Sequence, residues 1–175
     1  MKHEAARRFA LRSRTAAAHA SLDASVGPLD SRDAYARYLR GLLAFRAPAE
    51  AALAGAGWTP APLAGLIAAD MADLGISPRD TVAVAAPAGG SAALGLAYVL
   101  EGSALGARLL DRQACALGLD AGFGARHLAA QTADLAAWHA FLGALEAADP
   151  FDLDAAAAAA DAAFAAAESA FADGA

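Results

Sequence analysis

The chain has 175 residues, the length of one domain, and 58% of them are apolar, which is enough to form a core without disulfides. The net charge of −6 disfavours nucleic acid as a partner, because an acidic surface repels phosphate groups. A single cysteine, Cys115, and the lack of a signal-peptide pattern favour the cytoplasm. No uninterrupted apolar run reaches the roughly 20 residues of a membrane span, so we expect no membrane partner. Alanine dominates the apolar fraction and favours helices, so residues 1–175 are expected to form one helical domain.

The first predicted helix runs from about Glu4 to Val26 and ends at Gly27-Pro28. Its inner stripe consists of residues at helical spacing: Leu11, Thr15, Ala18 and Leu22. His19 falls on this stripe, and Arg12 lies two turns earlier, about 10 Å along the axis and on nearly the same face. This pair suits a flat anionic metallocycle, with the imidazole at its centre and the cation at its carboxylate edge. The alternative is a core histidine bonded to a carbonyl group.

Two further helices and a loop follow. Asp30 or Ser31 is expected to cap the second helix, and Pro48 to kink or end it. The inner face of this helix is predicted to carry Tyr35, Tyr38, Leu39, Leu42 and Phe45 or Arg46. The third helix is expected to begin at Thr59-Pro60 and to end at Gly75, with these residues inward: Leu63, Leu66, Ile67, Met71 and Leu74. Residues 77–90 are predicted as a loop, because a strand there would have no partner.

Three helices are predicted in the second half of the chain. One runs from Ser91 to about Leu117 and is stopped by Gly118. Next comes a segment from Phe123 that becomes a helix through Leu135, Trp138, Leu142 and Leu145 and is broken by Pro150. The last is capped by Asp152 or Asp154 and ends near Asp173-Gly174. No repeat and no hairpin signal is present, so about six helices should pack around one core.

Two glycines interrupt the long helix at positions 102 and 106. Glycine in a helix costs about 1 kcal/mol relative to alanine, so a pair on one face needs a reason. Either a neighbouring helix packs closely against Gly102 and Gly106, or the helix bends over a planar ligand that lies flat on its backbone. Ser103, between them, could hydrogen-bond its own backbone or a bound water.

Two segments together carry a family resemblance. Residues 11–19, with the sequence LRSRTAAAH, resemble the first-helix motif of the heme oxygenases, in which Leu, a basic residue, Thr and His recur at these offsets. Residues 98–106, with the sequence YVLEGSALG, resemble the distal-helix motif of the bacterial branch, which includes enzymes that supply biliverdin to bacteriophytochromes. The resemblance extends over nearly the whole chain through residues 66–75 (with Asp70 and Leu74), Trp138, Leu142, Leu145, Phe164 and Phe171.

The resemblance implies an all-α, single-domain, heme-oxygenase-like multi-helix bundle. Such a protein uses O2, and electrons from a reductase or ferredoxin, to cleave heme to biliverdin, ferrous iron and CO. His19 would be the axial iron ligand, with its other ring nitrogen donating to Asp23. The distal segment would consist of Gly102, Ser103 and Gly106, and the other heme contacts would be Arg12, Tyr98, Leu105, His139, Phe164 and Phe171.

The chain departs from the family pattern at three positions. Ser103 stands where many members carry a distal aspartate, although the Glu-Gly-Ser form is typical of the bacterial branch. Positions where a cation is common in the penultimate helix hold His139 and Leu135. These departures leave open a second reading: a heme-oxygenase-like protein without turnover that binds heme, a tetrapyrrole or a partner protein in a regulatory role. A purely structural helical domain is the third.

Other candidate residues give weaker signals. His127 and His139 lack identifiable metal-ligand partners, so they are expected at the surface or at an interface. Cys115 is expected to be a small core residue. The arginine cluster at positions 7, 8, 12 and 14 is either a solvated face or a docking patch for an acidic electron donor, and a bacteriophytochrome is a candidate partner for the product.

Overall fold

The computed structural model describes residues 6–133 and 135–172, and every regular element in these ranges is an α-helix. The helices are α1 (Ala6–Val26), α2 (Arg32–Ala52), α3 (Ala64–Asp73), α4 (Gly90–Ala116), α5 (Arg126–Ala133), α6 (Ala136–Ala147) and α7 (Leu153–Ala172). Isolated bridge pairs around Asp120 are the only β-type pairing that the described residues show. The prediction of an all-α fold is confirmed.

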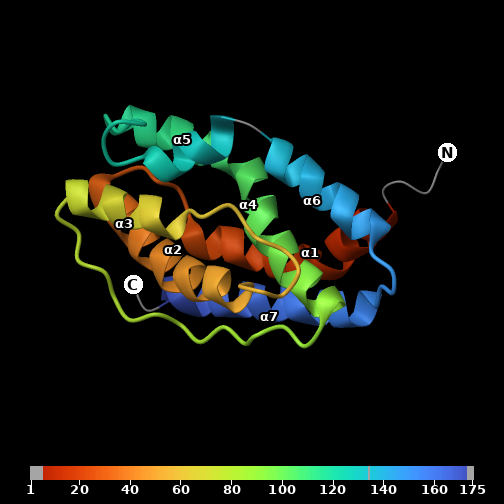
Figure 1. Cartoon of the computed structure of the whole chain (residues 1–175). Coiled ribbons are helices and arrows are strands. Elements are labelled where there is room, and N and C mark those ends of the chain that lie inside the picture. The colour runs from red at the N-terminus through yellow and green to blue at the C-terminus, as the bar shows by residue number, and fades with distance from the viewer. Residues whose placement is uncertain (1–5, 134, 173–175) are drawn as a thin grey trace.

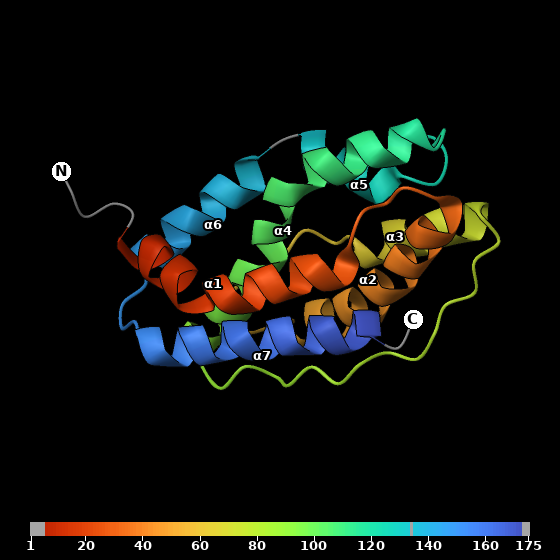
Figure 2. The same ribbon diagram turned by 180° about the vertical axis from the view of Figure 1, so that it is seen from behind.

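Helix α7 supports the other long helices. It packs along α1, α2 and α4, and Figures 1 and 2 show α1, α2 and α7 running lengthwise while α4 crosses them toward α5. The face that α7 buries consists of small side chains: Ala156, Ala157, Ala160, Ala163, Ala167 and Ala170. Because small side chains let helix backbones approach closely, the alanine-rich face of α7 packs tightly against its neighbours.

Two clusters of apolar side chains form the core. One joins α1, α2, α4, α6 and α7 around residues such as Leu11, Leu100 and Phe141. The other joins α2, α3, α5 and the C-terminal part of α4 around Tyr35 and Ile67. Helices α2 and α4 contribute to both clusters, so their courses determine how the two halves of the bundle meet.

Several helix ends follow the local signals. The Ser31 hydroxyl accepts a hydrogen bond from the Ala34 amide at 3.1 Å and caps α2. At the start of α7, Asp152 Oδ1 accepts from the amides of Asp154 and Ala155. Gly75 and Gly118, with φ of 65° and 76°, follow the ends of α3 and α4.

Pro48 does not end its helix, since α2 continues to Ala52. A proline has no amide hydrogen, so Pro48 leaves the carbonyl of Ala44 without its usual partner four residues later. The amide of Val82, from the loop after α3, donates to that carbonyl at 3.1 Å. A contact from a distant segment therefore replaces the missing helix bond.

Two other helix predictions are wrong. Helix α3 begins at Ala64 rather than at Thr59-Pro60, because the Glu50 carboxylate of α2 accepts from the amides of Leu63 and Ala64. The segment from Phe123, which was expected to become one helix through Leu145, forms two helices, α5 and α6, so the described residues form seven helices rather than six. The predicted start at Glu4 and the end near Asp173-Gly174 lie outside the described residues.

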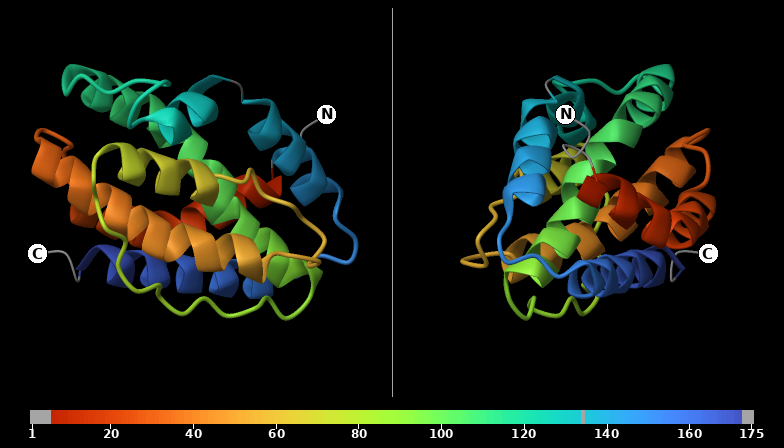
Figure 3. Two further views of the ribbon diagram at one scale, coloured as in Figure 1. Left: turned by 60° about the vertical axis from the view of Figure 1, so that its left-hand side comes forward. Right: turned by 90° about the vertical axis from the view of Figure 1, so that its right-hand side faces the viewer.

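The remaining predictions on organisation have mixed outcomes. Residues 77–88 form no helix or strand, as predicted, and run past α7 in Figures 1 and 3. Cys115 is exposed rather than part of the core. Among the described helices, α4 is long and apolar enough to cross a membrane, but a helix that contacts α7, α5 and α6 in a core meets the same criteria.

The close approach of α4 to α7 predicts opposite effects for two glycine-to-alanine substitutions. A Cβ atom at Gly95 would clash with the backbone carbonyl of Ala156, so Gly95→Ala should destabilise the protein by roughly 3 kcal/mol. At Gly143, in α6, nothing lies within 4 Å of an added Cβ, so Gly143→Ala should stabilise by about 1 kcal/mol. Urea unfolding of both variants checks this, and equal effects would contradict the close approach.

Candidate functional site

The candidate site lies between α1 and the middle of α4, residues 98–109. Helix α1 packs against α7 and α6, while α1 and α4 scarcely contact each other (Figure 2). They meet through side chains, where the Tyr98 hydroxyl is hydrogen-bonded to the Thr15 side chain. Two helices that are held by a third helix, rather than by each other, can leave a slot for a flat ligand.

His19 does not lie on the buried stripe of α1, contrary to the prediction. Its side chain is 63% exposed, while Leu11 and Thr15 are buried. Ala18 takes the inner position at this turn, because a step of about 100° per residue places His19 at the edge of the face on α7. The ring stands edge-on to the buried Phe164 of α7, with the centroids 5.7 Å apart.

The imidazole of His19 has one engaged nitrogen. Nδ1 lies 3.1 Å from Asp23 Oδ2, as the sequence predicted for this pair one turn apart. If Nδ1 carries the proton and donates to the carboxylate, Nε2 keeps a lone pair, and the described residues provide it with no hydrogen bond. The alternative of a core histidine bonded to a carbonyl does not fit this geometry.

The face of α4 that follows Tyr98 is open. An added Cβ at Gly106 would meet nothing within 4 Å, and one at Gly102 would meet only the ring of Trp138 at 3.9 Å. Leu105 and Leu109, on the same face, are 51% and 54% exposed. The glycine pair is therefore not explained by close packing of a neighbouring helix, and it forms an apolar surface bare of side chains.

Both hydrogen bonds of the Ser103 hydroxyl are made with protein groups. Its hydroxyl donates to the Leu100 carbonyl at 2.7 Å and accepts from Gln131 Nε2 at 2.8 Å. Of the two predicted alternatives, the structure shows the bond to its own backbone.

Two cations gather at the N-terminal end of the slot. The charges of Arg12 and Arg8 lower the pKa of Tyr98, although burial has the larger effect and the net shift is upward. The Arg8 guanidinium lies over the Trp138 ring at 5.8 Å, and that ring is 6.2 Å from the ring of Tyr98. A carboxylate at this end would therefore meet positive charge.

Arg8 and Leu109 were not predicted to belong to this region. Arg8 lies four residues before Arg12, and Leu109 lies seven residues after Gly102, so helical spacing alone would have placed both residues on the faces that line it.

Two predicted heme contacts are not brought to this slot by any described contact. His139 is exposed on α6 and has no described side-chain contact with the other predicted residues. Phe171 stacks on Tyr38, with centroids 6.3 Å apart, and fills the space above Gly41. The predicted aromatic pair is thus divided, with Phe164 beside His19 and Phe171 in the other core cluster.

The residues present fit a heme group. The fit depends on the cradle at Gly102 and Gly106, which side chains would fill in an ordinary helix. It depends also on the donor set, in which the imidazole of His19 stands beside the apolar ring of Phe164 and lies on one helix with Arg12. Iron is held by imidazole, the macrocycle by apolar surface and the propionates by cations, and all three are represented.

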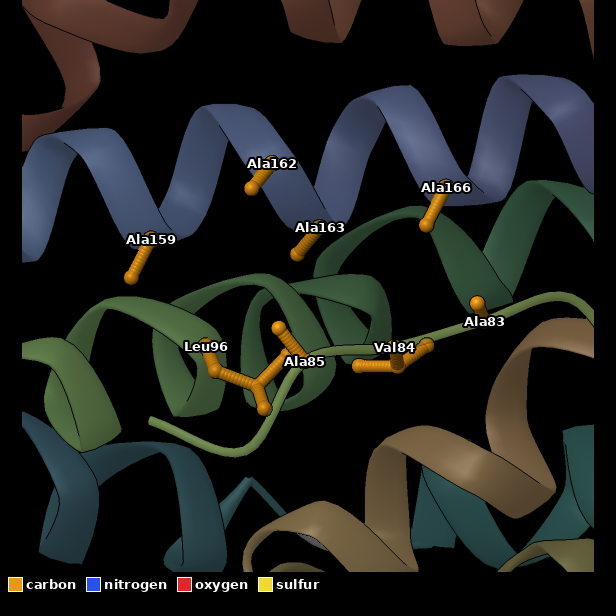
Figure 4. Close-up of a pocket in the computed structure, with 8 residues that line it drawn as sticks. All are labelled: Ala83, Val84, Ala85, Leu96, Ala159, Ala162, Ala163 and Ala166. Atoms are coloured by element: carbon orange, nitrogen blue, oxygen red, sulfur yellow. The ribbon is translucent and has the colours of Figure 1, made fainter. Parts of the chain in front are cut away.

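Two cavities lie outside the slot. One of about 220 Å³ lies behind α4, and Arg46, Glu101, Gln131 and Trp138 contribute to its wall. Trp138 also touches Gly102, so this ring separates the cavity from the glycine face. The other, of about 190 Å³, lies between residues 83–85 and the alanines of α7 (Figure 4). All residues that line the second cavity are apolar, so it offers no polar group for chemistry.

A second titratable cluster is fully buried in the other half of the bundle. His127, expected at the surface, is 0% exposed, and its Nδ1 lies 2.7 Å from Asp70 Oδ2. Its Nε2 is 3.3 Å from the Tyr38 hydroxyl, and Arg126 pairs with Asp70 as well. Burial acts to raise the pKa of Asp70, but hydrogen bonds from His127 and from the amide of Arg126 hold that pKa below its usual value.

The fold and the site together define a class: helical bundles with a solvent-accessible histidine on the first helix and a glycine-containing helix whose open face could receive a flat ligand. Comparisons with known proteins find two similar heme oxygenases. The heme oxygenase PigA of Pseudomonas aeruginosa is 43% identical over 81 residues, which cover 45% of this chain and 41% of that protein. The chain thus matches less than half of the length of this curated relative.

A structural neighbour covers far more of the chain. The crystal structures of NO- and CO-bound heme oxygenase from Neisseria meningitidis match it with a TM-score of 0.77 at 27% identity, over 99% of this chain and 92% of that one. No family model matches. The chain is therefore similar to bacterial heme oxygenases in part of its sequence and in nearly the whole of its fold.

The buried cluster around Asp70 predicts a pH-dependent stability. A pKa held below the unfolded value of about 3.8 means that the carboxylate stabilises the fold at higher pH, and that this contribution is lost as the pH falls through the folded pKa. Asp70→Asn should therefore cost roughly 3 kcal/mol at pH 7. It should cost progressively less below pH 4, as measured by urea unfolding across pH. A cost that stays constant with pH would contradict an ionised Asp70.

Proposed function

We propose that the chain is a heme oxygenase, which binds heme between α1 and α4 and cleaves it to biliverdin, ferrous iron and CO. The observation that carries the proposal is the pairing of an available imidazole, His19, with the open glycine face of α4. The likeness to two bacterial heme oxygenases, one over nearly the whole chain, supports it. Residues 1–175 would then act as one domain.

Each residue of the slot has a role in this proposal. His19 binds the iron through Nε2, and Asp23 orients the ring through Nδ1. Phe164 packs against the imidazole edge and limits its rotation. Arg12 and Tyr98 bind the propionates, and Leu105 covers part of the macrocycle. Gly102 and Gly106 let the backbone of α4 approach the heme face.

The chemistry is that of the heme itself, which is both cofactor and substrate: its iron activates O2 and its ring is oxidised. The protein excludes bulk water and leaves room for O2 at the glycines. Ser103 is placed to hold protons or water near the distal segment, through its hydroxyl and its partner Gln131.

Electrons must come from a partner. The exposed Arg12 and the half-buried Arg8 lie at one end of the slot, where an acidic reductase or ferredoxin could approach the heme edge. We infer a cytoplasmic location from the single cysteine, and a bacteriophytochrome remains a candidate recipient of the biliverdin.

The alternative of a heme-binding protein without turnover rests on the sparse cations of α6, where the candidate positions hold Leu135 and His139. Arg8 supplies charge near the same corner from α1. The structure therefore gives no specific reason to prefer the inactive form.

Substitution of His19 tests the iron ligand. Wild-type protein titrated with heme should develop a Soret band typical of histidine ligation, and ascorbate with O2 should then produce biliverdin. His19→Ala should lose this spectrum and the turnover, because the described residues of the slot provide no other imidazole. Added imidazole should restore the spectrum, which controls for misfolding. An unchanged spectrum in His19→Ala would overturn the assignment.

Substitution of Arg12 tests the carboxylate end of the slot. Loss of one charged hydrogen bond to a propionate should weaken heme affinity roughly tenfold in Arg12→Gln. The matched control is Arg14→Gln, because Arg14 lies on the same helix but pairs with Asp154 of α7 at 2.6 Å. Heme titration by absorbance measures both, and equal affinities in the two variants would remove Arg12 from the site.

A further inference from the structure

Arg46 is a buried cation of α2 that contacts the back of α4. Its side chain is 3% exposed, and Nη1 donates to the Leu100 carbonyl at 2.9 Å. Nε donates to Glu50 at 2.7 Å, and Nη2 donates to the Ala61 carbonyl at 2.9 Å. The guanidinium is therefore held by three segments at once: α2, the connection to α3, and α4.

The Leu100 carbonyl receives two side-chain donors. Besides Arg46, the Ser103 hydroxyl donates to it at 2.7 Å. In a regular helix this oxygen accepts the amide of Ala104. Side-chain donors that compete for a helix carbonyl weaken the backbone ladder and bend helices.

Helix α4 can bend most easily just after Leu100. Gly102 and Gly106 follow directly and lack the side chains that stiffen a helix. In Figure 2, α4 changes direction between the part that crosses α7 and the part beside α5. The position of the glycine pair relative to α1 therefore depends on what happens at Leu100.

The residues that hold this part of α4 lie mainly on its core side, opposite the open glycine face. On the open face, nothing described lies within 4 Å of a Cβ at Gly106, and Leu105 is half exposed. Behind it, Arg46 holds Leu100, while Glu101, which is 4% exposed, accepts from Trp58 Nε1 at 3.0 Å. Contacts with core residues thus determine the position of the glycine face of α4.

We propose that Arg46 is a positioning residue for the heme site, which sets the course of α4 over Gly102 and Gly106 through the Leu100 carbonyl. It thereby sets the separation between the glycine backbone and the imidazole of His19. This inference rests on the proposed function. An arginine suits this role because its planar fork reaches Glu50, Ala61 and Leu100 together, which the single ammonium of a lysine does not.

The test compares two Arg→Lys substitutions in the heme complex of the full chain. Arg46→Lys removes the fork behind α4, and Arg126→Lys removes a fork that binds Asp70 and Asp73 in the other half of the bundle. The measurements are the heme dissociation rate, the infrared stretching frequency of CO on the ferrous heme, and the unfolding midpoint of the heme-free protein.

Both variants should unfold more easily, but only Arg46→Lys should change the heme. Its heme should dissociate roughly tenfold faster, the factor that corresponds to about 1.4 kcal/mol. The CO band, which reports the surroundings of the distal face, should shift and broaden. Arg126→Lys should keep the wild-type band and dissociation rate.

A second variant acts on the same carbonyl from an exposed position, so it should fold. Ser103→Ala should also shift the CO band. The shift in the double variant Arg46→Lys/Ser103→Ala should differ from the sum of the two single shifts, because both donors act on Leu100. Should Arg46→Lys not fold, a CO band in Ser103→Ala identical to the wild type overturns the proposal by itself.

The remaining outcomes distinguish a failure of the proposed function from a failure of the role proposed for Arg46. If wild-type protein does not bind heme through His19, the proposed function falls, and the role of Arg46 falls with it. If heme binds through His19 but Arg46→Lys and Arg126→Lys give the same CO band and dissociation rate, Arg46 is only a structural residue.

Discussion

The site depends on α1 and α4 being held by α7 and not by each other. The alanine face of α7 lets both helices come close, and at Gly95 the backbone of α4 approaches that of α7 directly. Beyond that contact α4 turns toward α5, while α1 continues along α7 (Figure 2). Few contacts join α1 to α4, and the face of α4 at Gly102 and Gly106 is left open, so the packing that stabilises the bundle leaves this face available to a ligand.

Polar residues in the core then fix the parts that apolar packing leaves free. Glu50 caps α3 from α2, and Arg46 joins the same carboxylate to the back of α4. The hydrogen bond between Asp70 and His127 joins α3 to α5 in the same way. The buried charges of Arg46, Asp70 and Glu101 have partners, as burial requires, and most of these bonds join residues far apart in the chain. The described residues make few such polar contacts on the open glycine face of α4, which leaves this surface available to a ligand.

Local signals predicted much of the fold, and contacts between distant segments explain most of the errors. Ser31 and Asp152 cap their helices as their residue types suggest. Pro48 failed as a helix breaker because Val82 donates to the carbonyl that it leaves free. In the same way, His127 is buried by an aspartate that no local pattern associates with it.

The site shows the same limits, since spacing placed His19 beside Asp23 but did not show that the His19 side chain lies at the exposed edge of the inner face. The central claim is that His19 Nε2 binds heme iron across the slot from α4. Resonance Raman spectroscopy of the ferrous heme complex, prepared with ¹⁵N-labelled histidine, tests it most directly. Ligation by His19 predicts an iron–histidine stretching band that moves on labelling and is missing from His19→Ala. The same band persisting in His19→Ala would show that another group holds the iron and would contradict the claim.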